Sequence, residues 1–146
     1  MDSAPQIANP ARTVRILHSA ILVGLVVIGA TFVVVLRLSR RPSPADASSL
    51  GLALAALSVA LLGVALGALR SRIPERRPDQ SLELYWSDAR TRGAAVVLWA
   101  VVEAAGLLAA VGYFRASGIA PAAALVLSIA TMIFLGPARL EADGAA

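Results

Sequence analysis

The sequence contains no cysteine and no lysine, and only 15% of its residues are charged. The absence of cysteine excludes thiolate metal sites, disulfides, a cysteine nucleophile and a lipoprotein anchor. The single histidine, His18, supplies neither the two ligands of a bis-histidine haem nor the cluster of ligands that a metal site needs. No P-loop, GxGxxG, HExxH or GxSxG motif is present. We therefore expect no metal, no cofactor and no enzymatic activity.

Long apolar runs are abundant instead. Hydrophobic residues make up 58% of the chain, and the mean hydropathy is +0.77. Each of four runs is close to the roughly 20 residues that a membrane-spanning helix needs. The first run has no small-residue cleavage site, so we interpret it as a retained helix. The sequence predicts an all-α, four-helix transmembrane bundle that forms one integral membrane domain, 1–146, with spans at about 16–36, 50–69, 93–114 and 118–135.

The arginines predict how this bundle is oriented. They lie at the ends of the apolar runs, so we attribute the high isoelectric point to membrane topology and expect no nucleic acid partner. Four spans place both termini and the loop 70–92 on one side, with nine of the 13 arginines: Arg12, Arg15, Arg70, Arg72, Arg76, Arg77, Arg90, Arg92 and Arg139. The other side carries Arg37, Arg40, Arg41 and Arg115. The positive-inside rule therefore predicts an inner-membrane protein with cytoplasmic termini.

The loop 70–92 begins with helix breakers and ends in a helical pattern. Pro74 and Pro78 oppose a helix in its first half, and Asp79 is a candidate N-cap for a new one. Apolar side chains then recur with helical spacing at Leu82, Tyr85, Trp86 and Ala89. This pattern predicts a short interfacial helical segment before the third span. We expect Tyr85 and Trp86 to anchor it in the membrane interface, with a docking surface for a partner as the alternative.

Two further expectations concern this loop and the C-terminus. Asp88 and Arg92 are four residues apart, which favours an ion pair on one face of a helix. The tail that follows Pro137 is short, and we expect it to be frayed.

Small residues recur along the second span. Gly63 and Gly67 form a GxxxG motif, and Ala56 and Ala60 extend it at helical spacing. Such a face lets another helix approach closely and gain dispersion contacts. The motif predicts helix packing, either within the chain or in an oligomer.

One carboxylate interrupts the third span. Glu103 lies roughly 15 Å along the helix from Gly93, which is near the middle of a hydrocarbon core about 30 Å thick. An ionised carboxylate there costs at least a few kcal/mol, so we expect it to be neutral, paired or facing a wet interior. The alternatives are a structural carboxyl that joins two helices and a carboxylate that exchanges protons or cations.

Small neighbours indicate which way Glu103 points. Alanines and glycines near it in the helix would admit a neighbouring helix, so we expect Glu103 to face spans two and four. Its carboxyl would then lie within hydrogen-bond reach of Ser58, Ser128 or Thr131. We expect Trp99 to close this site one turn nearer the cytoplasm.

Part of the chain resembles a known family. Residues 51–114 combine a Gly/Ala-rich span, a polar loop with arginine and proline, and the segment RGAAVVLWAVVEA at 92–104. This arrangement is similar to the helical hairpin of the proteolipid c subunit of rotary ATP synthases. The resemblance implies a cytoplasmic loop and gives Glu103 the ion-carrying part. The chain departs from the family because its loop lacks Arg-Gln-Pro. It also resembles small four-span bacterial membrane proteins.

Two functions follow from these patterns. The first is a non-catalytic subunit or assembly factor of a larger membrane complex. The alternative is translocation of protons or cations through Glu103 in an oligomer. For either function, the expected partners are the lipid bilayer and further membrane helices, from copies of this chain or from other subunits.

Overall fold

The computed structural model describes residues 9–39 and 47–142, and these residues are helical with no strand among them. The predicted all-α fold is therefore confirmed. The α-helices are α1 (Pro10–Ser39), α2 (Ala47–Val64), α3 (Leu82–Ser87), α4 (Ala89–Ala116), α5 (Ile119–Phe134) and α6 (Pro137–Ala142). A π-helical turn, η1 (Ala65–Leu69), and a 3₁₀ turn, η2 (Arg70–Arg72), extend α2.

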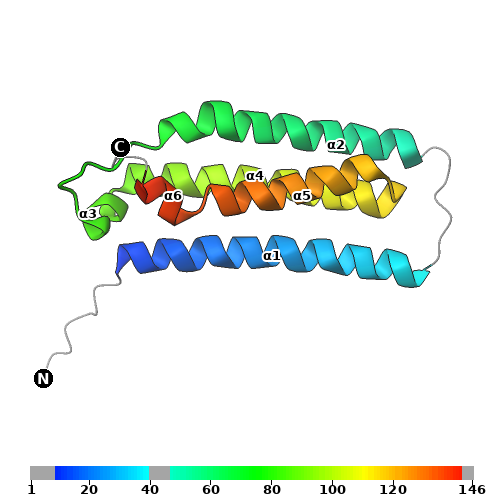
Figure 1. Cartoon of the computed structure of the whole chain (residues 1–146), viewed down its shortest axis with the longest axis horizontal. Coiled ribbons are helices and arrows are strands. Elements are labelled where there is room, and N and C mark those ends of the chain that lie inside the picture. The colour runs from blue at the N-terminus through cyan, green and yellow to red at the C-terminus, as the bar shows by residue number, and fades with distance from the viewer. Residues whose placement is uncertain (1–8, 40–46, 143–146) are drawn as a thin grey trace, which may run out of the picture.

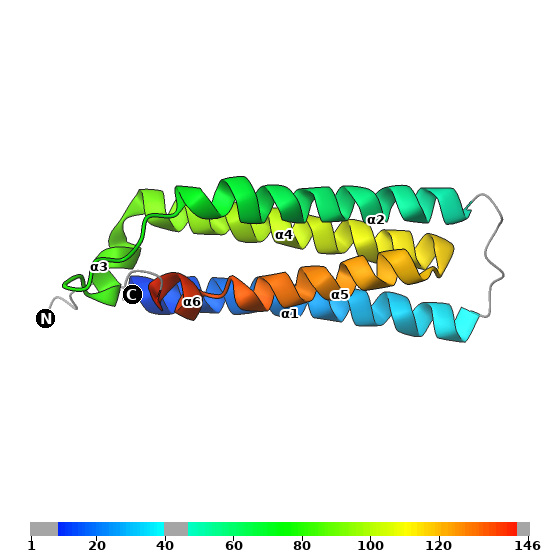
Figure 2. The same cartoon turned by 45° about the horizontal axis from the view of Figure 1, so that its top comes forward.

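The helices α4 and α5 form an antiparallel pair at the centre of the bundle. Figures 1 and 2 show α2 on one side of this pair and α1 on the other. Accordingly, α4 contacts all three of its long neighbours. The short helices α3 and α6, the start of α1 and the turn η2 gather at one end of the bundle, which we call the α3 end.

Three helical segments are long and apolar enough to cross a membrane, namely Pro10–Ser39, Ser48–Arg72 and Ala89–Ala116. They contain the first three predicted spans. The fourth predicted span corresponds to α5, which is shorter at 16 residues. Its rise of about 24 Å falls short of a hydrocarbon core of about 30 Å. The chain leaves the helix at Leu135, and Pro137 then begins α6.

Side-chain caps set the boundaries of α3 and α4, and they differ from the predicted ones. Ser81, rather than Asp79, is the N-cap of α3, and its hydroxyl accepts a hydrogen bond from the Leu84 N–H. Asp88 is the N-cap of α4. Its carboxylate accepts from the Thr91 N–H at 2.9 Å and from the Thr91 hydroxyl at 2.6 Å. Because Asp88 serves the helix start in this way, the predicted ion pair with Arg92 is wrong.

Glycines bring the central helices together at positions that the sequence analysis did not single out. A Cβ at Gly51 of α2 would clash with the Ala116 side chain of α4. A Cβ at Gly112 of α4 would lie 3.2 Å from Leu54 and 3.3 Å from Pro121. The absence of a side chain therefore allows α2, α4 and α5 to approach closely at the end opposite α3.

Candidate functional site

Glu141 of α6 joins α1, α3 and the loop before α3 at the α3 end. Its carboxylate accepts a 2.8 Å hydrogen bond from Nη2 of Arg15 in α1 and a 2.9 Å bond from Nε1 of Trp86 in α3. Its backbone carbonyl accepts from Nε of Arg76 at 3.0 Å. Glu141 is buried, so the tail predicted to be frayed is, as far as Ala142, an ordered helix, α6, that ties the loop and α1 together.

The aromatic pair of α3 lies inside the protein rather than at its surface. Tyr85 and Trp86 are buried, and their rings meet edge to face at 4.8 Å. Rings that are buried within the protein do not contact the membrane interface, so the predicted role of both residues as interface anchors is wrong. The Tyr85 hydroxyl donates to the Pro74 carbonyl at 2.9 Å, and burial raises the pKa of this phenol. Both rings pack in the core between α3, α1 and α6. The helical spacing of the sequence identified their shared face but not the helices against which that face packs.

His18 and Trp99 cover the last turn of α5. Nε2 of His18 lies 3.0 Å from the Met132 carbonyl oxygen, and Nε1 of Trp99 donates to the Leu135 carbonyl at 2.8 Å. The two rings meet edge to face with centroids 4.9 Å apart. These bonds satisfy carbonyls that a helix end leaves without intrahelical partners. Trp99 therefore stabilises the end of α5.

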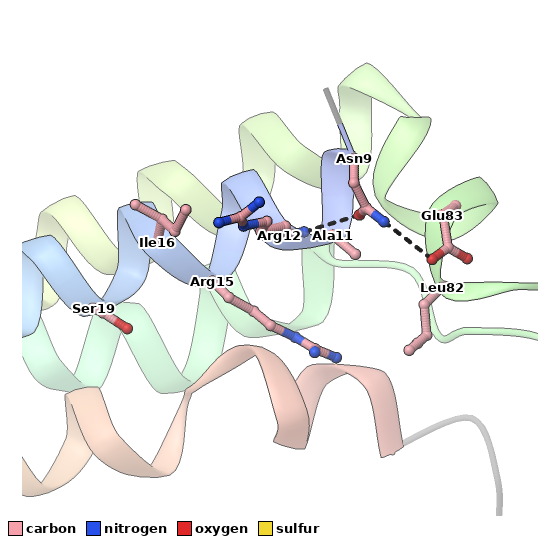
Figure 3. Close-up of a pocket in the computed structure, with 8 residues that line it drawn as sticks. All are labelled: Asn9, Ala11, Arg12, Arg15, Ile16, Ser19, Leu82 and Glu83. Carbon is pink, nitrogen blue, oxygen red and sulfur yellow. Dashed lines mark hydrogen bonds between the residues drawn. The ribbon is translucent and has the colours of Figure 1, made fainter. Parts of the chain in front are cut away.

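A cavity of about 410 Å³ opens between the first turns of α1 and α3. Figure 3 shows Arg12 and Arg15 of α1 on one side and Glu83 of α3 on the other. The side chain of Asn9 bridges the two helices, because its Oδ1 accepts from the Arg12 N–H at 3.1 Å and its Nδ2 donates to Glu83 at 3.5 Å. Arginine and glutamate charges face one another here, and Arg15 is already paired with Glu141. The cavity therefore presents no strong excess of either charge.

Glu103 is half-buried at the middle of α4, as the fifteenth of its 28 residues. Trp99 and Gly106 each lie about one turn from Glu103. Trp99 contacts His18 of α1, and Gly106 lies against Leu25 of α1. A Cβ at Gly106 would also lie 3.2 Å from Ser128 of α5, so Glu103 is on the side of α4 that faces α1 and α5. The prediction that it faces spans two and four is therefore wrong for span two. Within the described residues, its carboxylate makes no hydrogen bond or ion pair.

The hydroxyl groups expected to bind Glu103 are occupied or buried elsewhere. Ser128 donates to the Ala124 carbonyl at 2.8 Å. Ser58 is fully buried in α2, and its Oγ has no hydrogen-bond partner in the described part of the chain. Thr131 is also buried and makes no bond to Glu103. The predicted hydrogen bond between Glu103 and these residues is therefore absent.

The small-residue face of α2 points away from the bundle. Ala56, Ala60, Gly63 and Gly67 are all exposed. A Cβ at Gly63 or at Gly67 would meet no other atom within 4 Å. Packing inside the chain uses the opposite face of α2, which carries the buried residues Ala55, Ser58 and Leu62. Of the two predicted uses of the GxxxG motif, packing within the chain is therefore excluded.

Chemistry-bearing groups are sparse in the described residues. No group of three or more His, Asp or Glu side chains there is placed to hold a metal ion. The chain matches no protein-family model, no curated protein and no solved structure. The resemblance of residues 51–114 to the proteolipid c subunit therefore stays a prediction.

Proposed function

We propose that this protein is a non-catalytic membrane subunit or assembly factor that packs against a partner helix through α2. The observation that carries the proposal is the outward direction of Ala56, Ala60, Gly63 and Gly67, which leaves a close-approach surface unused within the chain. Gly63 and Gly67 lie one turn apart, so a partner backbone can reach both. Exposed Val59 and Val64 flank the surface and would add dispersion contacts.

The arrangement of charges supports an inner-membrane orientation with cytoplasmic termini. The elements at the α3 end carry all nine arginines of the predicted cytoplasmic side. At the opposite end, the described residues include Arg37 and Arg115, while Arg40 and Arg41 lie outside them. By the positive-inside rule, this distribution supports a cytoplasmic location of the α3 end. A reporter fused at Asp46, outside the described residues, tests this: a cytoplasmic signal contradicts the orientation.

Substitution of the two glycines tests the packing role. The variants Gly63→Leu and Gly67→Leu should fold because nothing in the chain occupies the space, but their side chains should keep a partner helix away. We expect extraction in mild detergent followed by mass measurement to show an assembly for the wild type and a smaller particle for both variants. Gly24→Leu in α1, where a Cβ also meets nothing within 4 Å, is the matched control. A wild type that is monomeric without co-purifying protein contradicts the proposal.

Glu103 supports a second candidate function, the exchange of protons or cations. A carboxylate at mid-helix that is half-buried and has no partner in the described residues is accessible from the outer surface of α4. Ionisable groups at such depth are costly and mark ion pathways in membrane proteins. This candidate needs an oligomer, because within the described residues no second acid lies deep in the bundle, and the buried base His18 is already bonded to the Met132 carbonyl.

A carbodiimide that is selective for carboxyl groups separates the two functions. An exchanging Glu103 should react, and a cation that binds there should protect it. The variant Glu103→Gln should then stay folded and lose ion movement in reconstituted vesicles. If Glu103 is unreactive and Glu103→Gln retains full function, the exchange role is ruled out, while the packing role of α2 is unaffected.

A further inference from the structure

A cleft of about 1110 Å³ lies between the end of α2 and the start of α4 at the α3 end. Its polar rim carries Ser71 and Arg72 from η2 and Asp88 and Arg90 from the start of α4. Its apolar wall includes Leu69 and Val97. The cleft is separate from the cavity between α1 and α3 and from the outward face of α2.

The rim has an excess of positive charge, because two arginines lie beside one carboxylate, Asp88, whose charge interacts with that of Arg90. Arg72 and Arg90 are exposed, and their guanidinium groups make no hydrogen bond or ion pair within the described residues. The carboxylate of Asp88 is the one acid on the rim, and it is bonded to Thr91 and to the Arg90 N–H. Two guanidinium groups are therefore available to an anion. Guanidinium groups bind phosphate oxygens with short, charge-assisted bonds.

The apolar wall decides what kind of anion fits. Val97 is 51% exposed on α4, and half-buried Leu69 at the end of η1 also lines the cleft. The wall therefore runs from the arginines onto the outer surfaces of two helices that are long and apolar enough to cross a membrane. A ligand with an anionic head and an apolar chain satisfies both parts of the cleft, and basic residues beside membrane helices attract anionic lipids.

We propose that this cleft binds one anionic phospholipid, with its phosphate at Arg72 and Arg90 and an acyl chain along α2 and α4. Gly93 lines the cleft, and a Cβ there would meet no atom within 4 Å. A side chain at this position would therefore occupy the open space of the cleft. The Ser71 hydroxyl already donates to the Ala68 carbonyl at 3.1 Å, so the two arginines are the groups that would hold the phosphate. This inference does not depend on the proposed packing role of α2.

Native mass spectrometry of the full chain in detergent micelles tests the site, with phosphatidylglycerol titrated against phosphatidylcholine. We expect one phosphatidylglycerol to stay bound and the double variant Arg72→Gln/Arg90→Gln to weaken its binding by about tenfold or more, since each charged hydrogen bond contributes strongly. The double variant Arg12→Gln/Arg77→Gln removes the same charge elsewhere and should bind as the wild type does. Added salt should weaken binding.

A second variant and a soluble probe make the test decisive. Gly93→Leu keeps every charge and should lower lipid binding by filling the cleft, whereas Gly24→Leu should not; circular dichroism verifies that the variants remain helical. Glycerol phosphate, which has the phosphate without acyl chains, should not displace the lipid. The proposal would be overturned if phosphatidylcholine is retained equally well or if the Arg12/Arg77 control loses binding to the same extent. Full binding by Gly93→Leu, or displacement of the lipid by glycerol phosphate, would also overturn it.

Discussion

Nε1 of Trp86 donates a 2.9 Å hydrogen bond to Oε1 of Glu141, although the two residues are 55 positions apart in the chain. Trp86 is fully buried, and Glu141 is 8% exposed. The other oxygen of the same carboxylate accepts from Arg15. This carboxylate therefore holds α1, α3 and α6 in one arrangement at the α3 end.

Removal of this carboxylate should destabilise the α3 end. We expect Glu141→Ala to lower the free energy of unfolding by about 1–3 kcal/mol, because the buried Trp86 N–H loses its acceptor. Glu141→Gln should cost less, since its amide oxygen can still accept from Trp86 while the pairing with Arg15 is lost. Urea unfolding in detergent, followed by tryptophan fluorescence, measures both. An unchanged midpoint for Glu141→Ala would show that α6 does not contribute to stability.

The helices of this chain could be predicted from its sequence, but their contacts could not. Apolar runs of sufficient length specify spanning helices whatever surrounds them. The surroundings of each helical face are not specified in this way. Tyr85 and Trp86 share a helical face in the sequence, and the same pattern fits an anchor in the membrane interface or a buried core. Their burial depends on α6, whose Leu140 and Glu141 follow a proline and carry no strong local signal.

The candidate sites show the same division. Glu103 stands out because it is alone in an apolar run, but the side of α4 that it occupies depends on the placement of α1. The GxxxG motif identified a close-approach face, yet the chain itself packs through Gly51 and Gly112, which lie outside that motif. Small residues are so frequent here that spacing alone does not separate the inner face from the outer one.

The glycines of α2 should respond oppositely to alanine. Gly51→Ala should lower stability by about 1–3 kcal/mol, because its new methyl group overlaps Ala116 of α4. Gly63→Ala should leave stability unchanged or raise it by up to about 1 kcal/mol, since open space surrounds this glycine and alanine favours the helix. Thermal unfolding followed by circular dichroism compares the two variants. Equal losses would mean that the face assigned as outward is buried against another element of the chain.

The N-cap of α4 should make stability depend on pH. Hydrogen bonds from the Thr91 hydroxyl and N–H hold the pKa of Asp88 below its ordinary value. A lowered carboxyl pKa stabilises the folded state above the ordinary pKa, and the contribution is lost as pH falls through the folded one. We therefore expect the melting temperature to fall between about pH 5 and pH 2.

Substitution of Asp88 isolates this contribution. Asp88→Asn should lower the melting temperature at neutral pH and flatten its decline in acid, because an amide has no proton to gain. Asp79→Asn, at the acid once expected to cap α3, is the control and should retain the wild-type slope. If Asp88→Asn shows the same acid dependence as the wild type, other carboxyl groups cause the decline.

Ser58 provides a test of whether the isolated chain is the complete assembly. Its side chain is fully buried, and Oγ has no hydrogen-bond partner in the described residues, so the hydroxyl carries a desolvation cost without a compensating bond. Ser58→Ala should therefore leave the stability of the purified protein unchanged or raise it by about 1 kcal/mol. Ser128→Ala removes the bond to the Ala124 carbonyl and should cost about 0.5–1.5 kcal/mol.

The stabilities of both variants are measured by thermal unfolding in detergent and again in native membranes. A loss of stability for Ser58→Ala in both settings would contradict the buried, unpartnered hydroxyl. A loss confined to native membranes would mean that the hydroxyl gains its partner only when the chain is assembled.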